Sequence, residues 1–285
     1  MGYLIAVANA LVVSGLDVLV KKLKGGNNLF LIWLRTAAAL PALALLVTIF
    51  ASWHIPPWQF WALVLGVNLP IEIAAYYLGF TAIQRSPLSL VAPLHAVSGI
   101  FLILTGYLVL GEQPSAFGAV GIMLIVLGSF FLGWRPGEES FFRGLTNVFR
   151  EPGSYLIIGV ALLTSVSIVI SKFAFRYASP LLTAFYIIGA IAVVLLPAAM
   201  RGMGSIQLPN RNRFLAALGA GAGASFALHY TGLSLLPAAY FISVKRVSMV
   251  FNVFWGRFVF HEDHTRERLI GALLMVAGVI LIAIS

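Results

Sequence analysis

Long apolar stretches, separated by short polar or charged connections, fill the sequence from Tyr3 to its end. Each stretch approaches the roughly 20 residues that a helix needs to cross a hydrocarbon core of about 30 Å. The lengths of the apolar stretches, and the charged, proline and glycine residues that separate them, predict ten membrane-spanning helices. They cover residues 3–20, 29–51, 58–83, 87–110, 114–134, 153–175, 180–200, 212–235, 237–260 and 266–285. The predicted fold class is an all-α membrane protein.

The connection over residues 135–152 is the longest one and divides the chain into halves of five helices, residues 1–134 and 153–285. The halves share residues in the same order, which indicates a repeat. An offset of 150 pairs Glu112 with Glu262, Gly121 with Gly271 and Gly128 with Gly278, and an offset of 151 pairs Lys21 with Lys172. Because five crossings are an odd number, the second half enters the membrane from the opposite side. Inverted repeats are typical of secondary transporters, whose substrate site lies at the repeat interface near the midplane.

Composition agrees with a membrane protein, because 61% of residues are hydrophobic and 9% are charged. Soluble domains carry about 25% charged residues. The formal net charge of +9 would suggest nucleic acid in a soluble protein, but here it reflects orientation and contact with membrane lipid, so no nucleic-acid partner is expected. Cysteine is absent, and neither a metal-ligand spacing nor a nucleophile triad is present. We therefore expect no metal, no cofactor and no enzymatic activity.

Loop charge predicts an orientation. Twelve Lys and Arg residues lie on the side reached after odd-numbered helices, whereas Arg176 lies on the other side. The positive-inside rule then places both termini outside.

The end of each half carries a recognisable pattern. It consists of Leu110-Gly111-Glu112 with Gly121 and Gly128, and of Phe260-His261-Glu262 with Gly271-Ala272 and Ala277-Gly278. Over its whole length the chain resembles EamA-type members of the drug/metabolite transporter superfamily. The resemblance implies a ten-helix transporter of small molecules in the inner cell membrane. It also implies cytoplasmic termini, opposite to the charge bias, so both orientations stay open.

The ninth predicted helix contains Ser243-Val244-Lys245-Arg246-Val247, which resembles the Lys-Arg pair of plastid triose-phosphate/phosphate translocators. Nucleotide-sugar transporters also have a binding lysine in this helix. In the translocators a second lysine precedes the acidic end of the fourth helix by seventeen residues. Here that position is His95, as far from Glu112 as Lys245 is from Glu262. The resemblance therefore implies anion binding, and His95 departs from the sugar-phosphate pattern.

Ionisable residues inside the predicted helices are the main site candidates, since they are costly there and mark functional sites. Lys245 and Arg246 lie two turns into the ninth helix and offer a movable ammonium and a planar fork for an anion. Alternatively, Glu72 pairs with them permanently. Glu72, two residues after Pro70, is also a candidate to accept a proton or bind a substrate amine.

Weaker candidates complete the predicted site. His95 and His229 are interpreted either as substrate contacts or as packed histidines, and Tyr230 beside His229 is included with them. Asp17, Lys21 and Lys172 are gate or coupling candidates at the ends of the first and sixth helices, with a local ion pair as the alternative. Arg35 is interpreted either as a residue that faces the cavity or as one that snorkels to the interface, and snorkelling is slightly favoured. The Gly219-x-Gly221-x-Gly223 pattern is interpreted as close helix packing, not as a phosphate loop.

Together these features predict a secondary transporter that moves a small anionic or zwitterionic metabolite by alternating access. A second hypothesis is a proton-coupled exporter of amino acids or hydrophobic compounds that uses Glu72. A hypothesis of another class is a membrane scaffold or lipid-handling protein without transport, in which Lys245, Arg246 and Glu72 neutralise one another.

Overall fold

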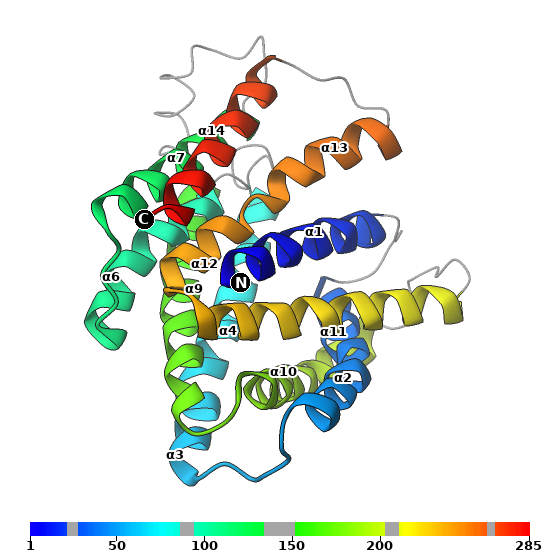
Figure 1. Cartoon of the computed structure of the whole chain (residues 1–285). Coiled ribbons are helices and arrows are strands. Elements are labelled where there is room, and N and C mark those ends of the chain that lie inside the picture. Colours follow the sequence, from blue (N-terminus) through cyan, green and yellow to red (C-terminus); the bar gives the residue numbers. More distant parts are fainter. Residues whose placement is uncertain (22–27, 86–93, 134–151, 203–210, 261–265) are drawn as a thin grey trace. The chain divides into compact units, whose positions relative to one another are not determined.

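The computed structural model describes residues 1–21, 28–85, 94–133, 152–202, 211–260 and 266–285. In these ranges the chain forms helices and no strand, and helical segments lie in all ten predicted ranges (Figure 1). The helices are α1 (Gly2–Lys21), α2 (Asn28–Phe50), α3 (Trp58–Trp61), α4 (Leu69–Arg85), α6 (Ser98–Leu110), α7 (Ala116–Gly133), α9 (Pro152–Phe173), α10 (Pro180–Gly202), α11 (Arg211–Leu235), α12 (Ala238–Lys245), α13 (Ser248–Phe260) and α14 (Arg266–Ala283). The all-α prediction is confirmed.

Short non-α segments interrupt or extend four of these helical runs. A π-helix, η1 (Ala62–Asn68), joins α3 to α4, and a 3₁₀-helix, η2 (His95–Val97), precedes α6. A second 3₁₀-helix, η3 (Ala174–Arg176), extends α9, and two turn residues separate α12 from α13. The third, fourth and ninth predicted helices are therefore not regular α-helices throughout.

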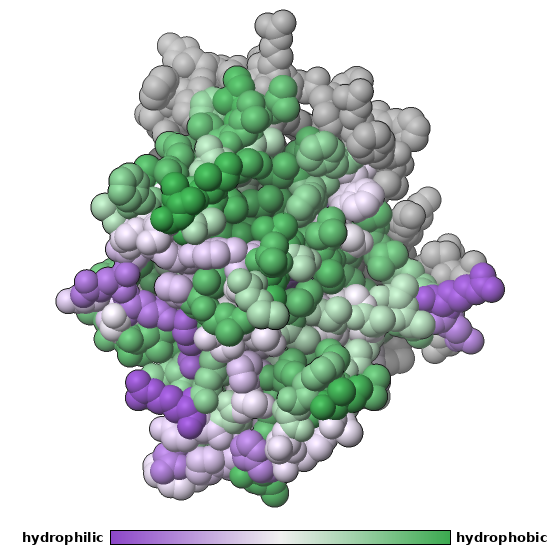
Figure 2. Space-filling model, in the orientation of Figure 1, coloured by the Kyte–Doolittle hydropathy of each residue, from purple (hydrophilic) through white to green (hydrophobic). Residues whose placement is uncertain are grey.

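Several described helices have the length and composition of membrane spans. Five helical stretches, beginning at Gly2, Leu29, Trp58, Gly153 and Pro180, are long and apolar enough to cross a bilayer. Three shorter apolar helices cover His95–Leu110, Ala116–Leu132 and Leu269–Ala283. Hydrophobic residues also cover much of the surface visible in Figure 2, and Leu108, Phe117 and Val193 are each more than half exposed. Such faces suit lipid, because the surface of a soluble domain lacks large apolar patches.

The described chain divides into two compact units. Unit 1 consists of Met1, Tyr3–Pro70 and Ile170–Leu235, and unit 2 consists of Gly2, Ile71–Val169 and Leu236–Ser285. Two boundaries fall inside α4 and α9, and the third falls just before α12. Each unit therefore contains helices from both sequence halves, so the compact units do not coincide with the repeats.

In unit 2, α7 and α14 pack closely along most of their length (Figure 1). A Cβ atom added to Gly121 would lie 2.6 Å from the carbonyl oxygen of Gly278, and one added to Gly128 would lie 2.6 Å from that of Gly271. Both helices therefore need glycine at these positions to approach each other. The residue pairs run in opposite directions along the two helices, so the helices are antiparallel. Equivalent helices of an inverted repeat are expected to pair in this way.

The same kind of contact joins α11 to α2 in unit 1. A Cβ atom on Gly219 would lie 2.6 Å from the carbonyl oxygen of Ala38, and one on Gly223 would lie 2.5 Å from the Cβ of Ala42. Small residues allow membrane helices to pack backbone against backbone. The structure thus supports the interpretation of this glycine pattern as a packing element.

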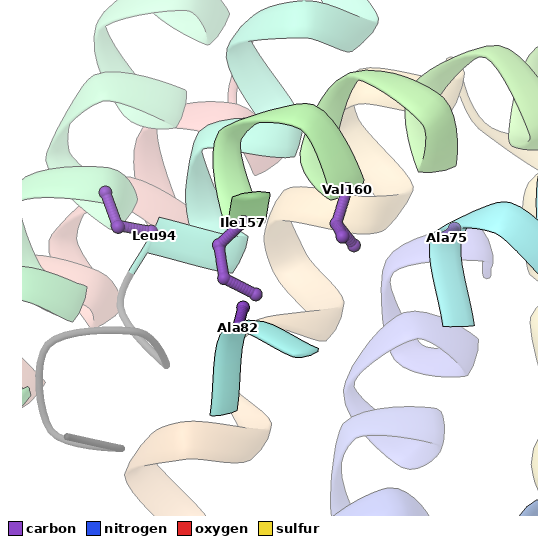
Figure 3. Packing of buried hydrophobic residues seen from close by; sticks show 5 residues of the cluster. All are labelled: Ala75, Ala82, Leu94, Ile157 and Val160. Atoms are coloured by element: carbon purple, nitrogen blue, oxygen red, sulfur yellow. The ribbon is translucent and has the colours of Figure 1, made fainter. Parts of the chain in front are cut away.

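A hydrophobic cluster fixes α4 against α9 in unit 2. Ala82 of α4 and Ile157 of α9 are completely buried, and Figure 3 shows the Ile157 side chain pointing toward Ala82. Ala75, Val160 and Leu94 are the other buried members of the cluster. Because Glu72 precedes Ala75 by one turn, this packing holds the start of α4 near α9.

Aromatic residues gather at one end of unit 1. The Trp61 and Tyr186 rings lie 4.9 Å apart, and the Trp53 and Phe185 rings lie 5.0 Å apart. Trp61 also donates a hydrogen bond from Nε1 to the Pro56 carbonyl oxygen, and the Tyr186 hydroxyl donates one to the His54 carbonyl oxygen. Tryptophan and tyrosine with apolar rings and satisfied polar atoms are typical of the membrane–water interface.

Candidate substrate site

The ninth predicted helix is interrupted at its two cations. α12 ends at Lys245, Arg246 and Val247 form a turn, and α13 begins at Ser248. The N–H of Val247 donates to the carbonyl oxygen of Val244, three residues earlier, instead of the fourth residue back. Irregular backbone at membrane depth is tolerated where it is buried in protein or lines a polar cavity. The interruption therefore marks the Lys245–Arg246 pair as a special position in this helix.

The fourth predicted helix departs from α geometry at the equivalent position. His95 begins η2, and α6 begins at Ser98, which is 150 residues before Ser248. The sequence spacing pairs His95 with Lys245. The structure adds that both helices change their hydrogen-bond pattern at this paired position.

Arg246 connects the two interruptions. Its Nη2 donates a hydrogen bond of 3.0 Å to the Ser98 hydroxyl, which in turn donates to the His95 carbonyl oxygen at 2.7 Å. Arg246 also interacts electrostatically with His95. Its Nε is buried and has no hydrogen-bond partner among the described residues. Unit 2 thus brings His95 and Arg246 together and leaves one guanidinium donor for another group.

Close backbone packing makes this arrangement possible. A Cβ atom on Gly99 would lie 2.6 Å from the Ser243 hydroxyl oxygen, so glycine at this position lets α6 approach α12. Ser243 is buried and precedes Lys245 by two residues. The contact fixes the start of α6 beside the end of α12.

Glu72 lies close to Lys245 in unit 2. It lies in the first turn of α4, and its Oε1 accepts a hydrogen bond from the Ser167 hydroxyl of α9. Lys245 interacts with this carboxylate electrostatically. Glu72, Lys245 and Arg246 are therefore parts of one polar region, which agrees with both the substrate-site and the counter-ion interpretations.

Before Glu72, the third predicted helix contains an irregular turn. The Leu69 N–H donates to the Val64 carbonyl oxygen, five residues earlier, in η1, and Pro70 has no N–H to donate. Asn68 in this segment is completely buried, and neither of its side-chain polar atoms has a hydrogen-bond partner within the described ranges. π-Helical turns are frequent at functional sites. Pro70 follows this widened turn.

Glu112 fixes the beginning of α12. Its Oε2 accepts a 2.7 Å hydrogen bond from the Ala238 N–H at the first position of α12. Tyr240 in the same turn accepts a 2.8 Å hydrogen bond at its hydroxyl from the Ser115 N–H. A carboxylate at a helix N-terminus satisfies a donor that has no partner within the helix. The pattern residue Glu112 therefore positions the helix that ends in Lys245.

Other predicted site residues lie in unit 1. His229 and Tyr230 belong to α11, their rings are 5.3 Å apart, and the Tyr230 ring packs against Phe175 at 6.2 Å. Tyr230 is buried. These contacts are compatible with packing alone, so a substrate role for His229 and Tyr230 stays a prediction.

The gate candidates also lie in unit 1, at helix ends. Asp17 is exposed one turn before the end of α1, and Lys172 lies in the last turn of α9. Lys21 is the last residue of α1, and its side chain lies outside the described residues. Their gate or coupling role stays a prediction.

Arg35 contacts a neighbouring helix of unit 1. Its guanidinium lies over the Phe226 ring of α11, with Cζ 5.6 Å from the ring centroid, and its Nε is buried. An aromatic ring attracts a cation, so this contact holds the side chain against α11. Snorkelling of Arg35 to the interface stays a prediction.

Three serines near the site were not singled out from the sequence. Ser98 accepts a hydrogen bond from Arg246, and Ser167 donates one to Glu72. Ser243 packs against Gly99. The offset of 150 from Ser98 to Ser248 is a usable signal, because it continues the pairing of His95 with Lys245. Ser167 gives no comparable signal, since its partner comes from another helix.

Comparison with solved structures supports the fold. One crystal structure of a protein aligns with 99% of this chain and 98% of its own, at 15% identity and a TM-score of 0.78. At this identity the similarity concerns the fold alone. A search of curated proteins found no significant match.

A family model describes both halves of the chain. The model of the EamA-like transporter family matches residues 1–134 and again residues 151–284. The double match confirms the repeat inferred from the glycines and glutamates. The chain is therefore a multi-pass membrane protein that belongs to the EamA-like transporter family, whose members transport small molecules.

Proposed function

We propose that this protein is a secondary transporter that moves a small anionic or zwitterionic metabolite across the inner cell membrane by alternating access. The supporting observation is the Arg246 guanidinium, held by Ser98 at the interruption of two repeat-related helices, with a buried Nε donor that has no partner in the described part of the chain. A carboxylate or phosphate oxygen would satisfy that donor in a planar, charge-assisted geometry. Lys245 adds a movable positive charge.

In this proposal Glu72 competes with the substrate. Without substrate, the carboxylate interacts with Lys245 and accepts a hydrogen bond from Ser167. An arriving anion takes over Lys245, and Glu72 is then balanced by Ser167 alone. Such an exchange would keep Lys245 beside an anion in both states. His95, His229 and Tyr230 are proposed as further substrate contacts, and Asp17, Lys21 and Lys172 as gates.

Thermal stability of the purified protein tests the substrate class. A ligand at 100 times its dissociation constant stabilises a protein by about 2.7 kcal/mol, which a panel of small carboxylates, amino acids and phosphate esters would reveal. The best compound is then measured for uptake into proteoliposomes. We expect Lys245→Gln and Arg246→Lys each to weaken its affinity about 10-fold to 100-fold, since charged hydrogen bonds contribute about 1.5–3 kcal/mol.

Arg213→Gln is the matched control, because Arg213 is an exposed cation in the first turn of α11. It should leave both affinity and uptake unchanged. Wild-type uptake by the Lys245→Gln and Arg246→Lys variants would contradict the anion site. Absence of uptake for every compound class, in a well-folded protein, would favour a non-transporting scaffold.

A proton-coupled exporter of amino acids or hydrophobic compounds is the second candidate, because Glu72 is the carboxylate beside the cation pair. Glu72→Gln separates the two mechanisms. A coupling carboxylate predicts that uptake driven by a pH gradient is lost while substrate exchange without a gradient persists. A simple counter-ion predicts that the variant changes both kinds of uptake together.

A further inference from the structure

Unit 1 contains a second cation within a helix, and its environment differs from that of Arg246. Arg35 lies seven residues after the start of α2, within a stretch that has the hydropathy of a membrane span. Its guanidinium faces the Phe226 ring, and its buried Nε has no hydrogen-bond partner among the residues described by the structure. An aromatic ring offers a cation a favourable surface, but it offers no acceptor in the plane of the guanidinium.

The sequence of unit 1 provides almost no acidic residue to neutralise Arg35. It contains nine Lys and Arg residues and one acidic residue, Asp17, whereas the eight other acidic residues belong to unit 2. Asp17 is exposed on α1. The positive charge of the protein is therefore concentrated in unit 1, and Arg35 is the member of this set that packs on an aromatic ring of α11.

A buried acceptor lies against the neighbouring residue of α11. Asn9 of α1 is completely buried and donates from Nδ2 to the Ser225 carbonyl oxygen at 2.7 Å. Its Oδ1 has no hydrogen-bond partner in the described ranges. Ser225, the partner of Asn9, and Phe226, the partner of Arg35, are consecutive residues of α11. Buried polar atoms without partners are rare in folded proteins and suggest a group that is missing.

Close packing holds α1 and α2 against α11. Gly221 of α11 approaches Leu16 of α1, where an added Cβ would lie 2.9 Å from Leu16 Cδ2. Gly219 and Gly223 approach α2 as closely. These contacts keep the helices that carry Asn9 and Arg35 in place on α11.

We infer that α1, α2 and α11 form a second anion-binding site, in which Arg35 binds a phosphate or carboxylate oxygen and Asn9 Oδ1 accepts a hydrogen bond from a hydroxyl or ammonium group of the same ligand. Phe226 supports one face of the guanidinium. The headgroup of an anionic glycerophospholipid and a free glycerol phosphate both have this chemistry. Arg35, Asn9 and Phe226 belong to unit 1, whereas Lys245 and Arg246 belong to unit 2.

Thermal unfolding of the full protein distinguishes the two sources. The protein is reconstituted in nanodiscs of phosphatidylcholine, with or without phosphatidylglycerol, and glycerol 3-phosphate is titrated into the nanodiscs that contain phosphatidylcholine alone. We expect the unfolding temperature to rise with at least one probe. Stabilisation by phosphatidylglycerol alone identifies a lipid headgroup, and stabilisation by glycerol 3-phosphate identifies a soluble anion.

Variants test whether Arg35 is responsible. Arg35→Gln should lose the stabilisation, with at least about 10-fold weaker apparent affinity. Arg213→Gln, which removes an exposed cation of the same unit, should keep it. Phe226→Leu should weaken the response while retaining apolar volume, and it serves where Arg35→Gln does not fold.

The inference is overturned if neither probe stabilises the wild-type protein. It is also overturned if Arg35→Gln, or Phe226→Leu in its place, responds as the wild type does. An equal loss of response in Arg213→Gln would attribute the effect to overall positive charge and would equally exclude the site.

Discussion

Ser98 accepts a hydrogen bond from Nη2 of Arg246 although the two residues are 148 positions apart in the sequence. Ser98 begins α6 in the first half, and Arg246 follows α12 in the second half. The link therefore joins the two irregular turns that the repeat relates to each other. It also sets the direction of the guanidinium, because a hydrogen bond at Nη2 limits the orientations of the other two guanidinium nitrogens.

We predict that Ser98→Ala weakens substrate affinity about 10-fold, because the loss of a hydrogen bond to a charged group costs about 1.5–3 kcal/mol. Ser234→Ala is the control, since the exposed Ser234 hydroxyl bonds only to its own helix, at the Thr231 carbonyl oxygen. Titration of both purified variants with the best ligand measures the difference. Equal affinities would show that Ser98 does not orient Arg246.

We predict that Gly128→Ala lowers the unfolding temperature. The added Cβ would lie 2.6 Å from the Gly271 carbonyl oxygen and from Met275 Cγ, so α7 and α14 must separate. Overpacking of this kind costs about 1–3 kcal/mol. The matched control is Gly159→Ala in α9, where no atom lies within 4 Å of the added Cβ.

The control should unfold at the same or a higher temperature, because alanine favours helix over glycine by about 1 kcal/mol. Differential scanning fluorimetry in detergent provides the comparison. If both variants behave alike, backbone contact between α7 and α14 does not limit stability.

Asn68→Leu should increase thermal stability. The Asn68 side chain is completely buried, and both of its polar atoms lack partners within the ranges that the structure describes. Replacing an unsatisfied amide with an apolar side chain of similar size removes a desolvation penalty of about 1–3 kcal/mol. Asn9→Leu provides the contrast, because it removes the hydrogen bond to Ser225 and should bring no such gain. A lower unfolding temperature for Asn68→Leu would contradict the expected gain.

Glu112→Ala is expected to destabilise the protein by about 0.5–2 kcal/mol, the usual range for loss of a helix cap. The change leaves the Ala238 N–H without the acceptor it has at 2.7 Å. Gln113→Ala, at the exposed neighbouring position, should have little effect. Unfolding temperatures of the two variants test the difference, and equal values would mean that water replaces the carboxylate.

The main features of the fold could be predicted from the sequence because apolar length has a direct physical meaning in a bilayer. The helix predicted from 180 to 200, for example, occurs as Pro180–Gly202. Repeat spacing likewise pairs His95 with Lys245, and the structure shows an irregular turn at both positions. Helix length and repeat spacing are both distances along the chain, so they can be counted in the sequence.

The irregular turns could not be predicted in the same way. The residues at the α12–α13 turn, Arg246 and Val247, include neither glycine nor proline, so residue type gives no sign of an interruption. The π-helix before Pro70 and the Ser167 hydroxyl beside Glu72 depend on neighbouring helices. The contact of Arg35 with Phe226 could not be predicted either, because the two residues are far apart in the sequence.

The glycine contact between α7 and α14 has a consequence for the origin of the two halves. Gly121 contacts Gly278, the repeat partner of Gly128, and Gly128 contacts Gly271, the repeat partner of Gly121. The glycine face of α7 is therefore complementary to a copy of itself that is turned over in the membrane. A single half, inserted in both orientations, could form this contact as a homodimer with dual topology. Fusion of two such copies would preserve the contact, and each copy would then be free to diverge, as His95 and Lys245 have done.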